Sequence, residues 1–144
     1  MEQHTNSVIQ YIRYFFLCGI TGWTLECFWT GLCAVILWED PMLLCKTSVW
    51  MFPIYGLAVL ILPVSRRLTH RPFYYRGIVY MILIFSIEFL AGGLLNMIHA
   101  CPWNYSNAPF NIMGVIRPDY APLWFLMGLI YEKVLNNRRF LCYT

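Results

Sequence analysis

A run of apolar residues from Ile78 to Ile98 most limits what this chain can fold into. About 20 consecutive apolar residues form a helix that is long enough to cross the hydrocarbon core of a bilayer. The run contains one charged side chain, the carboxylate of Glu88. A charge near the middle of a bilayer costs a few kcal/mol, so it usually faces a protein interior, a polar cavity or a partner. The run therefore predicts a membrane-spanning helix with a candidate functional residue at its centre.

The composition extends this prediction to the whole chain. Of its 144 residues, 60% are hydrophobic and 12% are charged, whereas a soluble domain carries roughly 25% charged residues. The net charge of +3 comes from basic residues in one loop and at the C-terminus. That distribution is typical of membrane orientation rather than of nucleic-acid binding. We predict an integral membrane protein with one compact domain, residues 1–144.

Four helical spans are predicted, and together they make an all-α membrane bundle. Their approximate ranges are 8–38, 49–64, 78–98 and 121–135. Glu39, Asp40 and Pro41 end the first span, because two acidic residues and a proline cannot continue an apolar helix cheaply. Pro118 and Pro122 suit the start of the fourth span, since proline is favoured in the first turn of a helix.

The basic residues predict the orientation of the bundle. Cytoplasmic segments of membrane proteins carry an excess of Lys and Arg. With both termini in the cytoplasm, the inner side holds eight basic residues and the outer side holds two. The inner set is Arg13, Arg66, Arg67, Arg71, Arg76, Lys133, Arg138 and Arg139, and the outer set is Lys46 and Arg117. We therefore expect a multi-pass protein of the cell membrane with both termini cytoplasmic.

Polar and small residues of the third span share one side of the predicted helix. At 100° per residue, Glu88, Gly92, Asn96 and His99 fall within about an 80° arc. A stripe of this kind on an apolar helix is expected to face the interior of the bundle.

The first span carries a second intramembrane carboxylate. Gly19, Gly22 and Glu26 share a face, and small residues at this spacing let helices approach closely. We expect this face to meet the stripe of Glu88. Two carboxylates in an apolar interior cannot both ionise cheaply, so they would share a proton, bind a cation or pair with donors. The alternative is that each glutamate only hydrogen-bonds a neighbouring helix and contributes to packing.

Two further segments are candidates for lining a site. The run Pro53–Gly56 frees backbone carbonyls in the second span, which fits either a cavity wall or an ordinary proline kink. Segment 103–114 is rich in turn formers and aromatic residues and is too apolar for a solvated loop. We expect it to fold back over the outer end of the bundle, between the third and fourth spans.

The sequence lacks the common catalytic motifs. It contains no Walker motif, GxSxG, HExxH or nucleotide-binding glycine loop. An ATP-driven role would therefore need a separate subunit. No spacing of His, Cys, Asp and Glu specifies a metal site, and we expect neither a metal ion nor another cofactor.

Four motifs occur in an order that is similar to a known family. They are Gly22-Trp23-x-x-Glu26, Pro53-Ile54-Tyr55-Gly56, Glu88-x-x-x-Gly92 and Trp103-Asn104-Tyr105-Ser106-x-x-Pro109-x-Asn111-x-x-Gly114-x-Ile116. Together they resemble the CmpB-like family of putative ABC transporter permeases, small multi-pass membrane proteins with vertebrate transmembrane relatives. The similarity runs from about Arg13 to Tyr131. It implies a role in transport. Asn104 stands where the family commonly has an aspartate.

These observations predict a permease-like protein with a polar pocket near the outer leaflet for a small polar or lipid-like ligand. Glu26 and Glu88 would form its floor, with Tyr55, segment 103–114 and Arg117 at its rim. The expected ligand-binding residues are Trp23, Glu26, Tyr55, Glu88, Asn96, His99, Trp103, Tyr105, Asn111 and Arg117. The expected partners are the lipid bilayer and either further copies of the chain or separate transporter subunits, and no nucleic acid.

Two other classes of function remain open at this point. The carboxylate pair could serve an intramembrane enzyme that modifies lipids by acid–base catalysis, for which the sequence offers no identifiable nucleophile. The chain could also be a structural or sensory membrane partner that binds no ligand.

Overall fold

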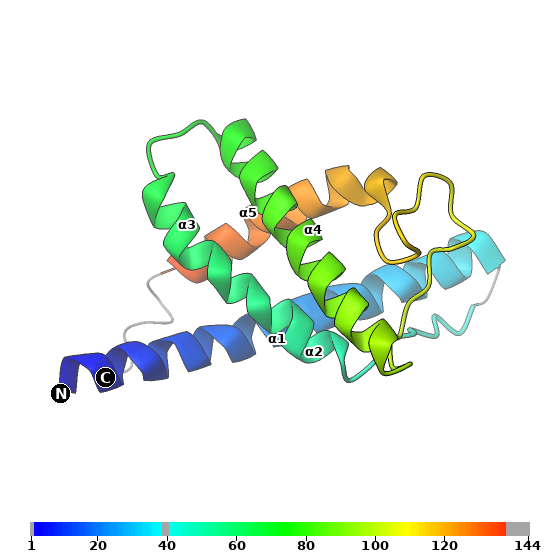
Figure 1. Ribbon diagram of the computed structural model, residues 1–144, viewed down its shortest axis with the longest axis horizontal. Helices are drawn as coiled ribbons and strands as arrows, with labels where there is room; N and C mark the ends of the chain where they lie inside the picture. Colours follow the sequence, from blue (N-terminus) through cyan, green and yellow to red (C-terminus); the bar gives the residue numbers. More distant parts are fainter. Residues whose placement is uncertain (1, 39–40, 138–144) are drawn as a thin grey trace. The chain divides into compact units, whose positions relative to one another are not determined.

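The computed structural model describes residues 2–38 and 41–137, and their regular structure is helical (Figure 1). The helices are α1 (Glu2–Trp38), α2 (Met51–Gly56), η1 (Leu57–Leu60), α3 (Ile61–Arg67), α4 (Phe73–Met97), η2 (Pro118–Tyr120) and α5 (Ala121–Asn136), where η denotes a short 3-10 helix. The described residues contain no β-strand, and their single isolated bridge joins Ile112 to Ile116. The predicted all-α class is therefore confirmed.

The helices match the predicted spans except at their ends. α4 begins at Phe73, five residues before the predicted start at Ile78. The apolar run is interrupted by Arg76, so hydrophobicity alone placed the start too late, whereas Pro72 precedes the first helical turn with φ −62°. Glu39 and Asp40, which supported the predicted end of the first span, and the basic residues Arg138 and Arg139 lie outside the described residues.

The second predicted span consists of α2, η1 and α3 in succession. Pro53 lies in the first turn of α2, where a missing N–H costs no helical hydrogen bond. Pro63 lies inside α3, and its ring would clash with the carbonyl of Val59 in a regular α-helix. Val59 belongs to η1, so the local tightening to 3-10 geometry falls at the carbonyl that Pro63 disturbs.

The chain divides into two compact units, Met1–Leu57 and Ala58–Thr144, and each is described by itself. In the first unit, α1 packs against α2. The rings of Phe15 and Phe52 meet edge to face with centroids 6.4 Å apart. Glycines allow the close approach: a Cβ at Gly19 would lie 3.0 Å from the carbonyl oxygen of Phe52, and one at Gly56 would overlap Phe15.

The loop after α1 returns along the same helix in the first unit. The backbone N–H of Lys46 donates to the hydroxyl of Thr30 over 3.2 Å. The carbonyl oxygen of Leu43 lies 2.9 Å from where a Cβ would stand at Gly31. This return path brings Thr47 beside Glu26, where the two side chains hydrogen-bond.

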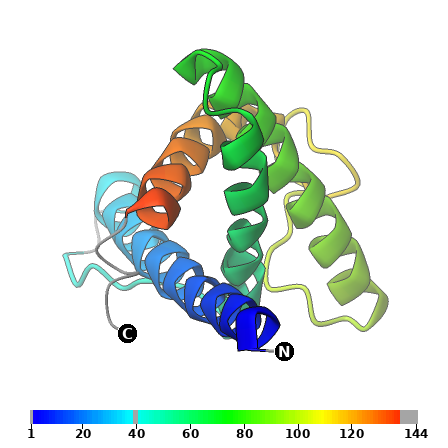
Figure 2. The same ribbon diagram turned by 90° about the vertical axis from the view of Figure 1, so that its left-hand side faces the viewer.

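In the second unit, α3 and α4 are joined by a short turn and run in opposite directions (Figure 2). α5 packs against α4, and two glycines mark the contact. Gly77 of α4 faces the ring of Phe125, and Gly128 of α5 faces the Cβ of Tyr80. Tyr80 is fully buried, so this contact forms the centre of the second unit.

Two of the described helices are long and apolar enough to cross a membrane by length and composition. They are Ser7–Leu37, within α1, and Phe73–Met97, the whole of α4. Only 17% and 22% of their most apolar windows are buried, whereas the core helix of a soluble protein is mostly buried. Large apolar side chains such as Leu90 and Leu94 remain about two-thirds exposed, at 65% and 66%. Surfaces of this kind suit contact with lipid.

Candidate functional site

Glu88 is a buried carboxylate on α4 and the centre of the candidate site. Its exposed fraction is 8%. The indole of Trp124, on α5, lies close enough to interact with the carboxylate, although its Nε1 reaches hydrogen-bond geometry with no described residue. Oxygen Oε2 of Glu88 has no hydrogen-bond partner among residues 2–38 and 41–137. Most buried polar atoms have such a partner, and exceptions often lie at functional sites.

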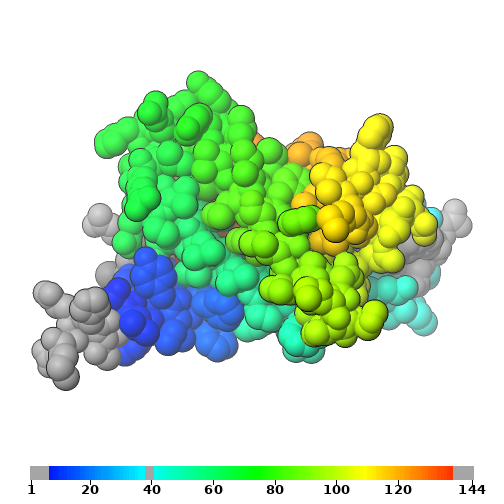
Figure 3. All heavy atoms as spheres, in the orientation of Figure 1, coloured from blue at the N-terminus to red at the C-terminus, as the bar shows by residue number. Residues whose placement is uncertain are grey.

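One helical turn beyond Glu88, Gly92 lets the segment after α4 pack against this face. A Cβ at Gly92 would overlap Val115 and lie 2.9 Å from the ring of Trp103. The indole Nε1 of Trp103 donates to the carbonyl of Val115 over 3.0 Å. The space-filling view shows this segment as a yellow lobe beside the C-terminal part of α4 (Figure 3). The segment therefore packs back against α4 at Gly92, and its predicted place over the outer end of a membrane bundle stays a prediction.

Side-chain amides hold this segment in shape. Oδ1 of Asn104 accepts from the backbone N–H of Ser106 over 2.9 Å and from its hydroxyl over 2.6 Å. Nδ2 of Asn111 donates to the carbonyl of Ala108 over 2.8 Å, and its Oδ1 accepts from the N–H of Gly114 over 3.0 Å. Gly114 has φ +68°, a left-handed conformation that suits glycine. The side-chain hydrogen bonds of Asn104 and Asn111 thus stabilise the turns of this segment.

The hydrogen bonds of Asn104 predict the effect of placing an aspartate at this position. Oδ1 of Asn104 is the acceptor in both hydrogen bonds, so a carboxylate oxygen of aspartate could accept them equally well. We expect Asn104→Asp to change the free energy of unfolding by less than about 0.5 kcal/mol, and Asn104→Ala to lower it by about 1 kcal/mol. Thermal unfolding in detergent would measure both. Equal losses would show that Oδ1 does not brace the turn.

Arg117 lies at the end of the same segment and stacks with aromatic rings. Its guanidinium carbon is 4.4 Å from the ring centroid of Tyr120 and 5.7 Å from that of Tyr105. It also forms an ion pair of 2.5 Å with Asp119, and this partner lowers the pKa of Asp119 and raises that of Arg117. Tyr120 contacts Trp124 edge to face with centroids 6.5 Å apart. A chain of aromatic contacts therefore connects Arg117 with the indole beside Glu88.

Glu26 has a different environment, in the first unit. Its Oε2 accepts a bond of 2.6 Å from the hydroxyl of Thr47, and Tyr55 of α2 is a second side-chain hydrogen-bond partner. Trp23, one turn earlier on α1, is exposed and contacts Phe52 with ring centroids 6.3 Å apart. The structure thus brings the predicted site residues Glu26 and Tyr55 together and supplies Thr47, which the sequence did not indicate.

Asn96 and His99 lie apart from the buried part of the predicted stripe. Both are exposed, whereas Glu88 and Gly92 are buried. His99 lies beyond the last residue of α4 and has φ +54°. The helical spacing that aligned it with Glu88 therefore does not extend to its position.

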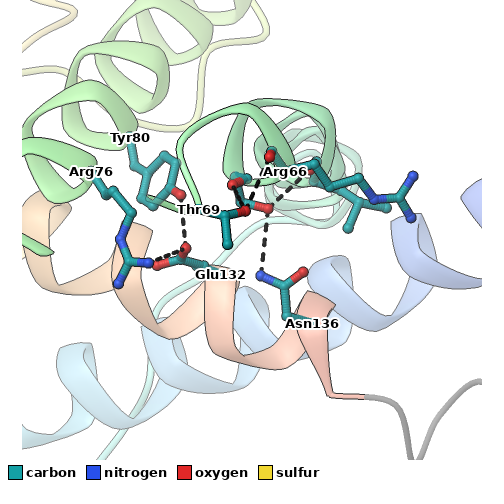
Figure 4. A network of polar contacts seen from close by, with 8 residues as sticks. Arg66, Thr69, Arg76, Tyr80, Glu132 and Asn136 are labelled. Atoms are coloured by element: carbon teal, nitrogen blue, oxygen red, sulfur yellow. Dashed lines mark hydrogen bonds and ion pairs between the residues drawn. The ribbon is translucent and has the colours of Figure 1, made fainter. Parts of the chain in front are cut away.

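The structure also contains a polar cluster that the sequence interpretation missed (Figure 4). Tyr80 of α4 donates to Oε1 of Glu132 on α5 over 3.0 Å, and Arg76 pairs with the same oxygen at 3.4 Å. Glu132 is 9% exposed. The signal was available, because Glu132 is a third carboxylate within a predicted apolar span. Its effect here is to join α4 to α5.

The fold and these sites define a class: small, all-helical proteins with apolar helices of membrane-spanning length and carboxylates buried among them. The family described as Putative ABC-transporter type IV, of the CmpB type, matches residues 13–141. Since the match covers nearly the whole chain, the protein belongs to this family, and the resemblance drawn from the four motifs is confirmed. No solved structure matches the chain. Family and apolar helices together indicate a membrane protein.

Proposed function

We propose that this chain is the membrane subunit of an ABC-type transporter and that Glu88 binds its ligand, a small polar or lipid-like molecule. The observation that carries the proposal is the buried Oε2 of Glu88, which has no hydrogen-bond partner among the described residues. A buried, incompletely paired carboxylate is costly unless a ligand, a proton or a cation completes its interactions. A residue that served only for packing would be better satisfied, as Glu132 is.

The segment after α4 gives this site a wall with matching chemistry. Trp103 packs at Gly92, one helical turn from Glu88. Arg117 stacks on the rings of Tyr105 and Tyr120, and the ring of Tyr120 contacts Trp124. Aromatic rings with one cation and one carboxylate can bind an amphipathic ligand, since the rings cover apolar parts and the charges orient polar groups. Within the first unit, Glu26, bonded to Thr47 and Tyr55, is proposed as a second ligand-binding carboxylate.

Transport requires features beyond this site. We propose four membrane spans in the cell membrane with both termini cytoplasmic, as the distribution of basic residues indicates. The sequence has no Walker motif, so ATP hydrolysis is assigned to a separate subunit. A bundle of four helices offers little room for a full translocation path, and we therefore propose that several copies or subunits assemble.

The test uses sealed membrane vesicles that contain the chain with its co-purified subunits. The vesicles receive ATP and a mixture of small polar solutes and lipid-like molecules, and mass spectrometry identifies what accumulates. Glu88→Gln is expected to reduce ATP-dependent accumulation about tenfold or more, because a charge-assisted hydrogen bond to the ligand is lost. Ser86→Ala is the matched control, since Ser86 is exposed on α4 and its hydroxyl donates to the carbonyl of Ile82 in the same helix.

The possible outcomes test two claims separately: that Glu88 binds the ligand, and that the protein transports it. Unchanged accumulation in Glu88→Gln would exclude Glu88 as the ligand site. An equal loss in Ser86→Ala would show that the loss reflects general damage to α4. Vesicles in which no solute accumulates with ATP would contradict the transport function itself.

A further inference from the structure

Basic side chains gather at one end of the Ala58–Thr144 unit, away from Glu88 along α4. This end comprises the last turn of α3, the turn that follows it, the first turn of α4 and the last turns of α5. Asn136 of α5 donates to the hydroxyl of Ser65 on α3 over 3.5 Å, and Arg76 pairs with Glu132 (Figure 4). Among residues 65–76 and 129–137, five side chains are Lys or Arg and one is acidic. The five are Arg66, Arg67, Arg71, Arg76 and Lys133, and the acidic one is Glu132.

An open groove of about 780 Å³ lies at this end, between α4 and α5. Its volume is within the range of about 300–1,000 Å³ that is usual for small-molecule sites. The lining residues are Phe73, Arg76, Leu129, Glu132, Lys133, Asn136 and Asn137. The groove therefore combines two cations and two side-chain amides with two apolar side chains.

Arg76 has hydrogen-bonding capacity that the protein does not use. Its Nη1 pairs with Glu132, but its Nε has no partner among the described residues. Among the described residues that line the groove, Glu132 is the only carboxylate, and it is already engaged by Arg76 and by the hydroxyl of Tyr80. A guanidinium with an unpaired Nε–H beside a neutralised carboxylate is suited to bind an anion, and phosphate oxygens fit its geometry best.

Two neighbouring features strengthen the preference for an anion. Lys133, on α5, adds an exposed ammonium to the groove wall. The groove also borders the N-terminus of α4 at Phe73, where Pro72 caps the helix without a side-chain acceptor. Helix N-termini present unpaired N–H groups and the positive end of the helix dipole.

The apolar side chains identify the source of the phosphate. Phe73, which is 63% exposed, and Leu129 line the same groove as the two cations. A free phosphate ion would make no use of them, whereas a phospholipid presents the start of its acyl chains next to its phosphate. The groove also lies at the end of α4, a helix of membrane-spanning length. We propose that this groove binds an anionic phospholipid, with Arg76 and Lys133 on its phosphate and Phe73 and Leu129 against its first acyl carbons.

The site is independent of the transport function, so it is tested with the purified full chain in detergent. Native mass spectrometry measures the fraction of protein that carries phosphatidylglycerol over a range of lipid concentrations. Lys133→Gln is expected to weaken the apparent affinity about tenfold, because one charge-assisted contact is lost. Arg67→Gln is the matched control. It removes the same charge from an exposed residue of the same end that does not line the groove, and a change of less than about twofold is expected.

The remaining measurements distinguish a specific lipid site from general electrostatic attraction between the lipid and the basic residues. Phosphatidylcholine, whose headgroup has no net charge, is expected to bind more weakly than phosphatidylglycerol. Equal weakening by Lys133→Gln and Arg67→Gln would overturn the proposal, since it would mean that only net charge matters. Displacement of the lipid by inorganic phosphate at an equal concentration would overturn the assignment of the phosphate to a lipid.

Discussion

Gly128→Ala is expected to lower the free energy of unfolding by about 1–3 kcal/mol, as for other overpacked cores. A Cβ at Gly128 would lie 2.5 Å from the Cβ of Tyr80, and a β-carbon moves only with its backbone. The added methyl group would therefore push α5 away from α4. The Tyr80–Glu132 bond lies one turn further along α5 and would lengthen as well. Denaturant unfolding in detergent, followed by tryptophan fluorescence, measures the loss.

Gly93→Ala provides the control for this prediction. Outside its own helix, no described atom lies within 4 Å of the Cβ that alanine would add at Gly93. Alanine is favoured over glycine in a helix by about 1 kcal/mol, so Gly93→Ala is expected to be neutral or stabilising. A loss comparable with that of Gly128→Ala would mean that the contact between α4 and α5 is looser than the structure shows.

Glu132→Leu is expected to have the second large effect, a loss of about 2–4 kcal/mol in the free energy of unfolding. It leaves the guanidinium of Arg76 without its anion and the hydroxyl of Tyr80 without its acceptor. The loss stays below that of a fully buried pair, because the Arg76 side chain is 25% exposed and can still reach water. The same unfolding assay applies.

The double variant Arg76→Leu/Glu132→Leu shows whether the pairing causes this loss. With both charges removed, neither is left unpaired, so the double variant is expected to be more stable than Glu132→Leu alone. Asp119→Asn gives an exposed comparison, since the side chain of Asp119 is 43% exposed in its pair with Arg117. Its effect is expected to be much smaller than that of Glu132→Leu. If the double variant were less stable than Glu132→Leu, the pair would not explain the effect of Glu132.

The helical class, the approximate ranges of the helices and the family could all be predicted from the sequence. Long apolar runs have few structural solutions in a bilayer, so the runs around Glu26 and Glu88 indicated helices directly. The helix ends were less accurate. Arg76 interrupts the apolar pattern, yet its side chain pairs with Glu132 and the helix continues through it.

The candidate site was predicted in part. A carboxylate in an apolar run is recognisable without a structure, and Glu88 is indeed buried. The sequence could not show that Trp124 lies beside Glu88 or that Thr47 bonds Glu26, because these contacts join residues far apart in the chain. His99 was aligned with Glu88 on the assumption that the helix continues, but α4 ends at Met97.

The sequence by itself determined that this is a helical membrane protein with rare buried carboxylates, because hydrophobicity and its interruptions are local properties of the chain. Only the tertiary structure decided how each carboxylate is satisfied. Glu132 is paired by Arg76 and Tyr80, Glu26 is hydrogen-bonded by Thr47, and Glu88 keeps one oxygen without a partner among the described residues. The cost of a buried charge depends on the groups that surround it in space, and those groups come from other helices and loops.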